Sequence, residues 1–66
     1  MPLKINLAAC RTNAGMNQKE WAEKLGVSRM TVSSWEKGRS EPSLNALRKI
    51  SELSGIPLDC IFIEES

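Results

Sequence analysis

In this 66-residue chain, the side chains that could bind a ligand carry positive charges or hydroxyl groups. The sequence offers no nucleophile with a histidine base to activate it. The sequence has no histidine and only two cysteines, Cys10 and Cys60. A zinc site needs four clustered cysteine, histidine or acidic ligands, and an activated serine or cysteine needs a neighbouring base. We therefore expect no enzyme activity, metal, cofactor or small-molecule substrate. Two cysteines also favour reduced thiols over a disulfide framework.

An exposed face with two serines, a methionine and a lysine is predicted for the helix that begins after Ser28. Val32 and Trp35 lie three residues apart and define the inward side of that helix. Steps of about 100° per residue then place four residues on the opposite side: Met30, Ser33, Ser34 and Lys37. Short side chains let a helix lie deep in a groove, and the major groove of duplex DNA, about 12 Å wide, admits a helix.

Arg29 lies in the first turn of this helix, where its guanidinium can donate two hydrogen bonds to O6 and N7 of guanine. Met30 can contact a thymine methyl group, and Ser33 and Ser34 can bond bases or phosphates. The alternative for Arg29 is an arginine paired with a local acid or with phosphate alone. The alternative for Met30 is an exposed methionine without a partner.

Phosphate contacts are expected from the groups that frame this helix. Asn17 and Gln18 begin the preceding helix, whose N-terminus presents free N–H groups to an anion. Lys37 and Arg39 flank the exit of the polar helix, and Ser43 begins the next one.

The charge distribution also indicates an anionic partner for the first part of the chain. Residues 1–40 hold seven basic and three acidic side chains, whereas residues 41–66 hold two basic and five acidic ones. A solvated charged surface would give a similar pattern, so this signal alone does not decide the function.

The spacing of apolar residues predicts five helices and no confident strand. We expect the helices over residues 3–13, 18–25 and 29–37, a fourth from Pro42 or Ser43 to 54, and a short helix or a turn over 58–62. Residues 60–63 are the only rival for a strand. Glycines end the first four helices, and they are Gly15, Gly26, Gly38 and Gly55.

Side chains at the helix ends and in the stripes support these boundaries. Asn17 with Glu20 three residues later is a capping-box pattern. Ser28 can cap the next helix in the same way, but Thr31 stands where the pattern has a glutamate. The fourth helix carries an apolar stripe that we expect to face inward: Leu44, Leu47, Ile50 and Leu53.

Residues 18–38 have the spacing of two helices joined by a tight turn. The crossing needs a small residue, which Ala22 supplies, and the turn needs a positive φ, which Gly26 adopts at little cost. Val27 then plugs the turn. We expect Trp21 and Trp35 to lie in the core, together with Cys10. This is the geometry of a helix-turn-helix.

The segment NQKEWAEKLGVSRMTVSSWEKGRSEPSLNALRKISELSGIPLD resembles the Cro/CI-type, or XRE-family, helix-turn-helix of phage repressors and bacterial regulators. The resemblance spans roughly residues 5–60. It implies an all-α fold, a compact five-helix bundle like that of lambda repressor. It also implies binding of double-stranded DNA, with the recognition helix at residues 29–37 in the major groove.

The resemblance also implies roles for individual residues. It places base contacts at Arg29, Met30 and Ser34, and backbone contacts at Asn17 and Gln18. It pairs the arginine of the first helix with the glutamate that ends the third, here Arg11 and Glu36. Some phage relatives carry a basic residue where this chain has Ser43 beside Glu41, so minor-groove contact from this loop is doubtful.

The C-terminal segment 56–63 is expected to form a dimer interface. An isolated module of this kind reads few base pairs, and specific binding typically uses two modules on half-sites about one helical turn apart. The apolar residues that remain for this contact are Ile56, Leu58, Ile61, Phe62 and Ile63. We expect a homodimer on a palindromic operator, assembled either before binding or only on the DNA.

These patterns favour a single domain over residues 1–66, with its motif at 17–37, that acts as a transcriptional regulator of Cro or repressor type. No apolar run reaches the length of a signal core or a membrane span, so we expect a cytoplasmic protein that does not bind membranes. Two alternatives use the same fold: the antitoxin of a toxin–antitoxin pair, and a module that binds only proteins.

Overall fold

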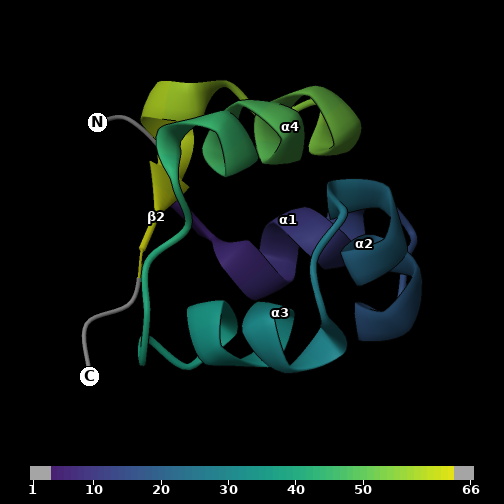
Figure 1. Cartoon of the computed structure of the whole chain (residues 1–66). Helices are drawn as coiled ribbons and strands as arrows, with labels where there is room; N and C mark the ends of the chain where they lie inside the picture. The colour runs from purple at the N-terminus through teal and green to yellow at the C-terminus, as the bar shows by residue number, and fades with distance from the viewer. Residues whose placement is uncertain (1–3, 64–66) are drawn as a thin grey trace.

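The computed structural model describes residues 4–63, in which four α-helices are joined by short turns and closed by a pair of two-residue strands (Figure 1). The helices are α1 (Leu7–Asn13), α2 (Gln18–Leu25), α3 (Arg29–Glu36) and α4 (Leu44–Ser54). A 3-10 turn, η1 (Leu58–Cys60), precedes strand β2 (Ile61–Phe62), which pairs in parallel with β1 (Ile5–Asn6).

Polar side chains begin the α-helices where the sequence predicts. Asn17 and Glu20 form a complete capping box at α2: Asn17 Oδ1 accepts from Glu20 N at 2.8 Å, and Glu20 Oε1 accepts from Asn17 N at 3.1 Å. Ser43 begins α4 by accepting from Ala46 N at 3.1 Å. These bonds satisfy backbone donors that a helix N-terminus leaves free.

The prediction of five helices is wrong at both ends of the chain. Residues 5 and 6 were expected inside the first helix, but Ile5 pairs with Ile61, and Asn6 caps α1 by accepting from Ala9 N at 2.8 Å. Leu3, also placed in that helix, lies outside the described residues. The segment expected as a short helix or a turn over residues 58–62 is the turn η1 at 58–60, and residues 61 and 62 form β2 instead. The rival strand at residues 60–63 was thus partly right.

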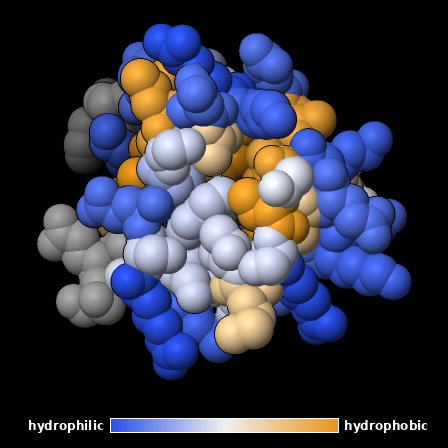
Figure 2. All heavy atoms as spheres, viewed as in Figure 1, coloured by the Kyte–Doolittle hydropathy of each residue, from blue (hydrophilic) through white to orange (hydrophobic). Residues whose placement is uncertain are grey.

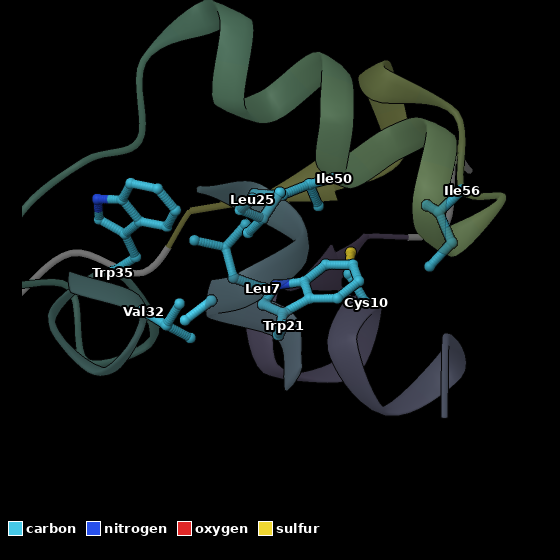
Figure 3. Packing of buried hydrophobic residues seen from close by; sticks show 9 residues of the cluster. Leu7, Cys10, Trp21, Leu25, Val32, Trp35, Ile50 and Ile56 are labelled. Atoms are coloured by element: carbon cyan, nitrogen blue, oxygen red, sulfur yellow. The ribbon is translucent and has the colours of Figure 1, made fainter. Parts of the chain in front are cut away.

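The core is formed by side chains from all four helices and from the segment after α4 (Figure 3). Trp21, Val32, Ile50 and Cys10 are the largest fully buried side chains. The predictions that both tryptophans and Cys10 lie in the core are confirmed, since Trp35 is also buried. Cys60 is half-buried and packs against this cluster.

The stripe predicted on α4 faces inward only in its middle. Ile50 is buried and Leu47 is half-buried against the core, but Leu44 is 56% exposed and Leu53 is 37% exposed. Residues three apart lie about 300° apart around a helix, so a strict three-residue repeat drifts around it. Leu44 and Leu53, at the two ends of the repeat, therefore leave the buried face.

Helix α1 lies between α4 and α3, with α2 beside it (Figure 1). This arrangement leaves the side of α3 that is turned away from α1 on the molecular surface. Within the described residues, no helix is long and apolar enough to cross a membrane.

Candidate DNA-binding surface

The turn between α2 and α3 is fixed by backbone hydrogen bonds around Gly26. Gly26 has φ of 72°, and its N–H donates to the carbonyl of Glu23 at 3.3 Å. The N–H of Val27 donates to the carbonyl of Ala22 at 3.0 Å, as in a Schellman motif. Val27 is half-buried against the core. The helix-turn-helix geometry predicted from the spacing is present.

The start of α3 is held by Ser28 and Thr31. Ser28 Oγ accepts from Thr31 N at 3.1 Å, and the two hydroxyl oxygens lie 2.9 Å apart. The threonine hydroxyl thus bonds the side chain of Ser28, whereas the carboxylate of a full capping box accepts from the backbone N–H of the N-cap residue. Both hydroxyls are committed to holding the first turn, the turn that carries Arg29.

The two sides of α3 differ sharply in exposure. Val32 and Trp35 are buried, whereas Met30 is 81% exposed. Arg29 and Lys37 are also exposed, but Ser33 and Ser34 are half-buried. The predicted buried and exposed sides of α3 are therefore right, although Ser33 and Ser34 are less exposed than Met30. Over α3, in the lower part of Figure 2, the surface is pale, with strongly hydrophilic side chains on either side.

The expected ion pair between Arg11 and Glu36 is present and ties α3 to α1. Arg11 Nε donates to Glu36 Oε2 at 2.8 Å, and a second guanidinium nitrogen donates to Oε1 at 3.3 Å. The side chain of Glu36 is only 9% exposed. The third guanidinium nitrogen donates to the carbonyl of Met16 at 3.1 Å. One arginine thus holds both the end of α3 and the segment that leads into α2.

Gln18 has a contact that the sequence did not reveal. Its side-chain Nε2 donates to Glu36 Oε1 at 3.1 Å, so the first residue of α2 reaches the last residue of α3. The 18-residue separation follows no helical period. Only the spacing of the whole motif, which brings the start of α2 beside the end of α3, offered a signal.

The other predicted phosphate ligands are exposed, but two of them also cap helices. The side chains of Asn17 and Ser43 accept backbone hydrogen bonds at the starts of α2 and α4. Lys37 and Arg39 are exposed in the segment after α3. The N–H of Arg39 donates to the carbonyl of Ser34 at 2.9 Å, which anchors this segment to α3.

The C-terminal apolar segment divides into core and surface. Ile56 is buried, so its assignment to a remaining apolar surface was wrong. Leu58 is 39% and Phe62 is 45% exposed. Ile61 and Ile63 are half-buried, and Ile61 packs against the core. Apolar side chains gather over η1 and β2, at the upper left of Figure 2.

The chemistry of the two thiols is limited by burial. Desolvation raises the pKa of the Cys10 thiol, although a hydrogen bond with Ser54 acts in the opposite direction. Both cysteines are free. Among residues 4–63, no group of three or more cysteine, histidine or acidic side chains is placed to hold a metal ion.

A family model described as helix-turn-helix matches residues 7–59. The chain belongs to this family of XRE, or Cro/CI, type. The matched residues include the four α-helices and the first two residues of η1. Members of this family are DNA-binding proteins without enzyme activity, and the polar face of α3 lies on the helix that follows the turn of the motif.

Regulators of transcription are among the proteins that this chain resembles. An uncharacterized HTH-type transcriptional regulator of Methanocaldococcus jannaschii is 40% identical over 63 residues, 96% of each chain. A prophage-derived uncharacterized regulator of Bacillus subtilis, YonR, is 38% identical over 80% of this chain and 49% of its own length. The transcriptional activator BcrR of Enterococcus faecalis is 34% identical over 89% of this chain and 29% of its own.

This helix-turn-helix protein is therefore a DNA-binding transcriptional regulator. It spans nearly the whole length of the archaeal relative but about half of YonR. No solved structure matches the chain.

Proposed function

We propose that this protein is a sequence-specific regulator of Cro or repressor type that reads duplex DNA by placing α3 in the major groove. The observation that carries the proposal is the side chain of Met30, which is 81% exposed next to Arg29 in the first turn of a helix whose other side is buried. Recognition helices present their first residues to base edges. Arg29 can donate two hydrogen bonds to a base edge, and Met30 beside it can pack on a methyl group there.

The base contacts follow from the chemistry of each side chain. Arg29 donates to O6 and N7 of a guanine, and Met30 packs on a thymine methyl group. Ser33 and Ser34 are half-buried, so their hydroxyls reach a base or a phosphate only when the helix lies deep in the groove. Their short side chains permit that approach.

The phosphate contacts frame α3 on both sides. Asn17 and Gln18 start α2, and their backbone amides belong to the free N–H groups of a helix N-terminus. Lys37, Arg39 and Ser43 lie after α3 and before α4. Contacts with the backbone set the register of the protein on the duplex, whereas the side chains of α3 supply the sequence preference.

We also propose that two copies bind a palindromic operator in the cytoplasm as a homodimer. The supporting feature is the exposed apolar surface of Leu58 and Phe62, which Ile61 and Ile63 extend at its edge. Two-fold symmetry in the protein would match two half-sites about one helical turn apart. An antitoxin would use the same surface to hold a different protein.

In-vitro selection of duplexes from a random pool tests the proposed function. Enrichment of a two-fold symmetric site with a preferred guanine in each half would support it. Binding that remains equal on all duplexes would refute sequence-specific regulation. Light scattering with and without the selected duplex then gives the stoichiometry. A strict one-to-one complex on a palindromic duplex would reject the dimer, and a complex with two copies would support it.

A further inference from the structure

The side chain of Met30 is apolar and yet more exposed than any other large apolar side chain among residues 4–63. It lies beside Arg29 on the exposed side of α3, in a protein of a DNA-binding family. In the major groove, an apolar side chain gains most against an apolar group, because a polar group would lose water there without gaining a hydrogen bond. The apolar group that base edges present in that groove is the methyl group at C5 of thymine. Met30 is therefore suited to a pyrimidine methyl group.

The hydroxyl groups around Met30 do not distinguish a donor on a base from an acceptor. Those of Ser28 and Thr31 lie 2.9 Å apart and are engaged in the cap of α3. Ser33 and Ser34 follow Met30 by one helical turn, and a serine hydroxyl both donates and accepts. None of these groups therefore separates thymine, whose O4 accepts, from cytosine, whose amino group donates.

The charged groups of α3 do not make this distinction at the base pair beside Met30 either. A carboxylate would favour the amino group of cytosine, but Glu36 is held by Arg11. An ammonium only donates, and Lys37 follows Met30 by seven residues, about 10.5 Å along a helix or about three base-pair steps. In the proposed function, the donors of Arg29 are occupied by a guanine.

We propose that this face of α3 recognises the methyl group of a pyrimidine beside a guanine, so that 5-methylcytosine can replace thymine and cytosine methylation strengthens binding. This inference rests on the proposed function, because it requires Arg29 and Met30 to read bases. Consecutive Cα atoms are about 3.8 Å apart and stacked base pairs about 3.4 Å, so the two side chains can reach neighbouring base pairs. 5-Methylcytosine has the methyl group of thymine and the amino group of cytosine.

The test changes one methyl group at a time in the operator obtained by in-vitro selection. In each half-site, the thymine beside the preferred guanine is replaced by deoxyuridine, which removes only the methyl group. The same base pair is then changed to cytosine and to 5-methylcytosine, each opposite guanine. We expect the wild-type protein to bind the methylated member of each pair, thymine over uracil and 5-methylcytosine over cytosine, roughly fourfold more tightly per methyl group.

The variant Met30→Ala should bring both methyl ratios close to one while the preference for the guanine remains. Leu44→Ala is the matched control, because Leu44 is another exposed large apolar side chain but lies on α4. We expect this control to keep both ratios of the wild-type protein. Circular dichroism establishes that each variant folds, and the exposure of both side chains makes a large loss of stability unexpected.

Three results would overturn the proposal. The first is a selected operator in which no thymine methyl group beside the guanine affects the affinity. The second is a methyl effect on thymine without one on cytosine, which would mean that the protein also reads O4. The third is a methyl effect that persists in Met30→Ala. A wild-type protein without preference for any duplex would instead refute the proposed function, so the two failures are distinguishable.

Discussion

At the scale of single residues, the first two side chains proposed to read DNA, Arg29 and Met30, are exposed. Met30 is 81% exposed and Arg29 extends into solvent beside it, whereas Ser28 and Thr31 on either side are committed to the helix cap. The sequence predicted this division because Val32 and Trp35 define the buried side of α3. It did not predict that Ser33 and Ser34 are half-buried.

Replacing Arg29 by alanine should cost about 1–3 kcal/mol of binding free energy at the selected operator and relax the preference at one base pair. The reason is that a bidentate contact with guanine discriminates against other bases. Titration of the variant against operators with each single base change measures this effect. An equal loss of affinity on every sequence would show that Arg29 contacts only phosphates.

The two cysteines should differ in reactivity in the folded protein. Burial raises the pKa of the Cys10 thiol, and the thiolate is the reactive form, so Cys10 should be alkylated far more slowly than half-buried Cys60 at neutral pH. Mass spectrometry after timed alkylation measures the two rates. In denaturant the rates should converge, and equal rates in the native state would contradict the buried position of Cys10.

At the scale of elements, the helices were largely predictable because their signals are local. Asn17 and Ser28 start helices, and Gly26 adopts the positive φ that ends α2. The sequence offered residues 60–63 as a rival strand, but β1 and its pairing with β2 were not predictable, because two-residue strands carry no periodicity. Ile5 lies before α1, since Asn6 caps that helix, and it pairs with Ile61, far along the sequence.

The effect of a substitution at Gly26, in the turn between α2 and α3, should depend only on how well the new residue adopts a positive φ. A Cβ atom there would meet nothing within 4 Å, but φ is +72°. Gly26→Ala should therefore lower the free energy of unfolding by about 1–2 kcal/mol, and Gly26→Asn should lower it less because asparagine tolerates this conformation. Chemical denaturation of both variants checks the order. A stability equal to that of the wild type would contradict it.

At the scale of the whole molecule, the proposed DNA-binding surface is helix α3 with two basic side chains, Lys37 and Arg39, after its end. The basic residues that flank α3 lie in the first part of the chain, which the charge count had already marked as basic. The ion pair of Arg11 and Glu36 followed from the family resemblance, but the third partner, Gln18, did not. The spacing of the motif brings the start of α2 beside the end of α3, but it does not specify which side chains bond there.

Replacing Lys37 by alanine should weaken binding to all duplexes and lower the slope of log affinity against log salt by about one unit. Lys37 is exposed at the C-terminal end of α3, where its ammonium can displace a counterion from the backbone. Titrations at several salt concentrations give the slope. An unchanged slope would place Lys37 outside the interface.

The parallel pairing of β1 and β2 brings together two segments from near the two ends of the sequence. Ile5 and its partner Ile61 are 56 positions apart. Contacts between such distant residues bear the full entropic cost of loop closure and here gain only two short strands. They should therefore be the first to open, with faster amide exchange at Ile61 and Phe62 than around Ile50 in α4. Phe62 also belongs to the proposed dimer surface, so a higher protein concentration should slow that exchange. Concentration-independent exchange would mean that subunit association and closure of the chain ends are separate events.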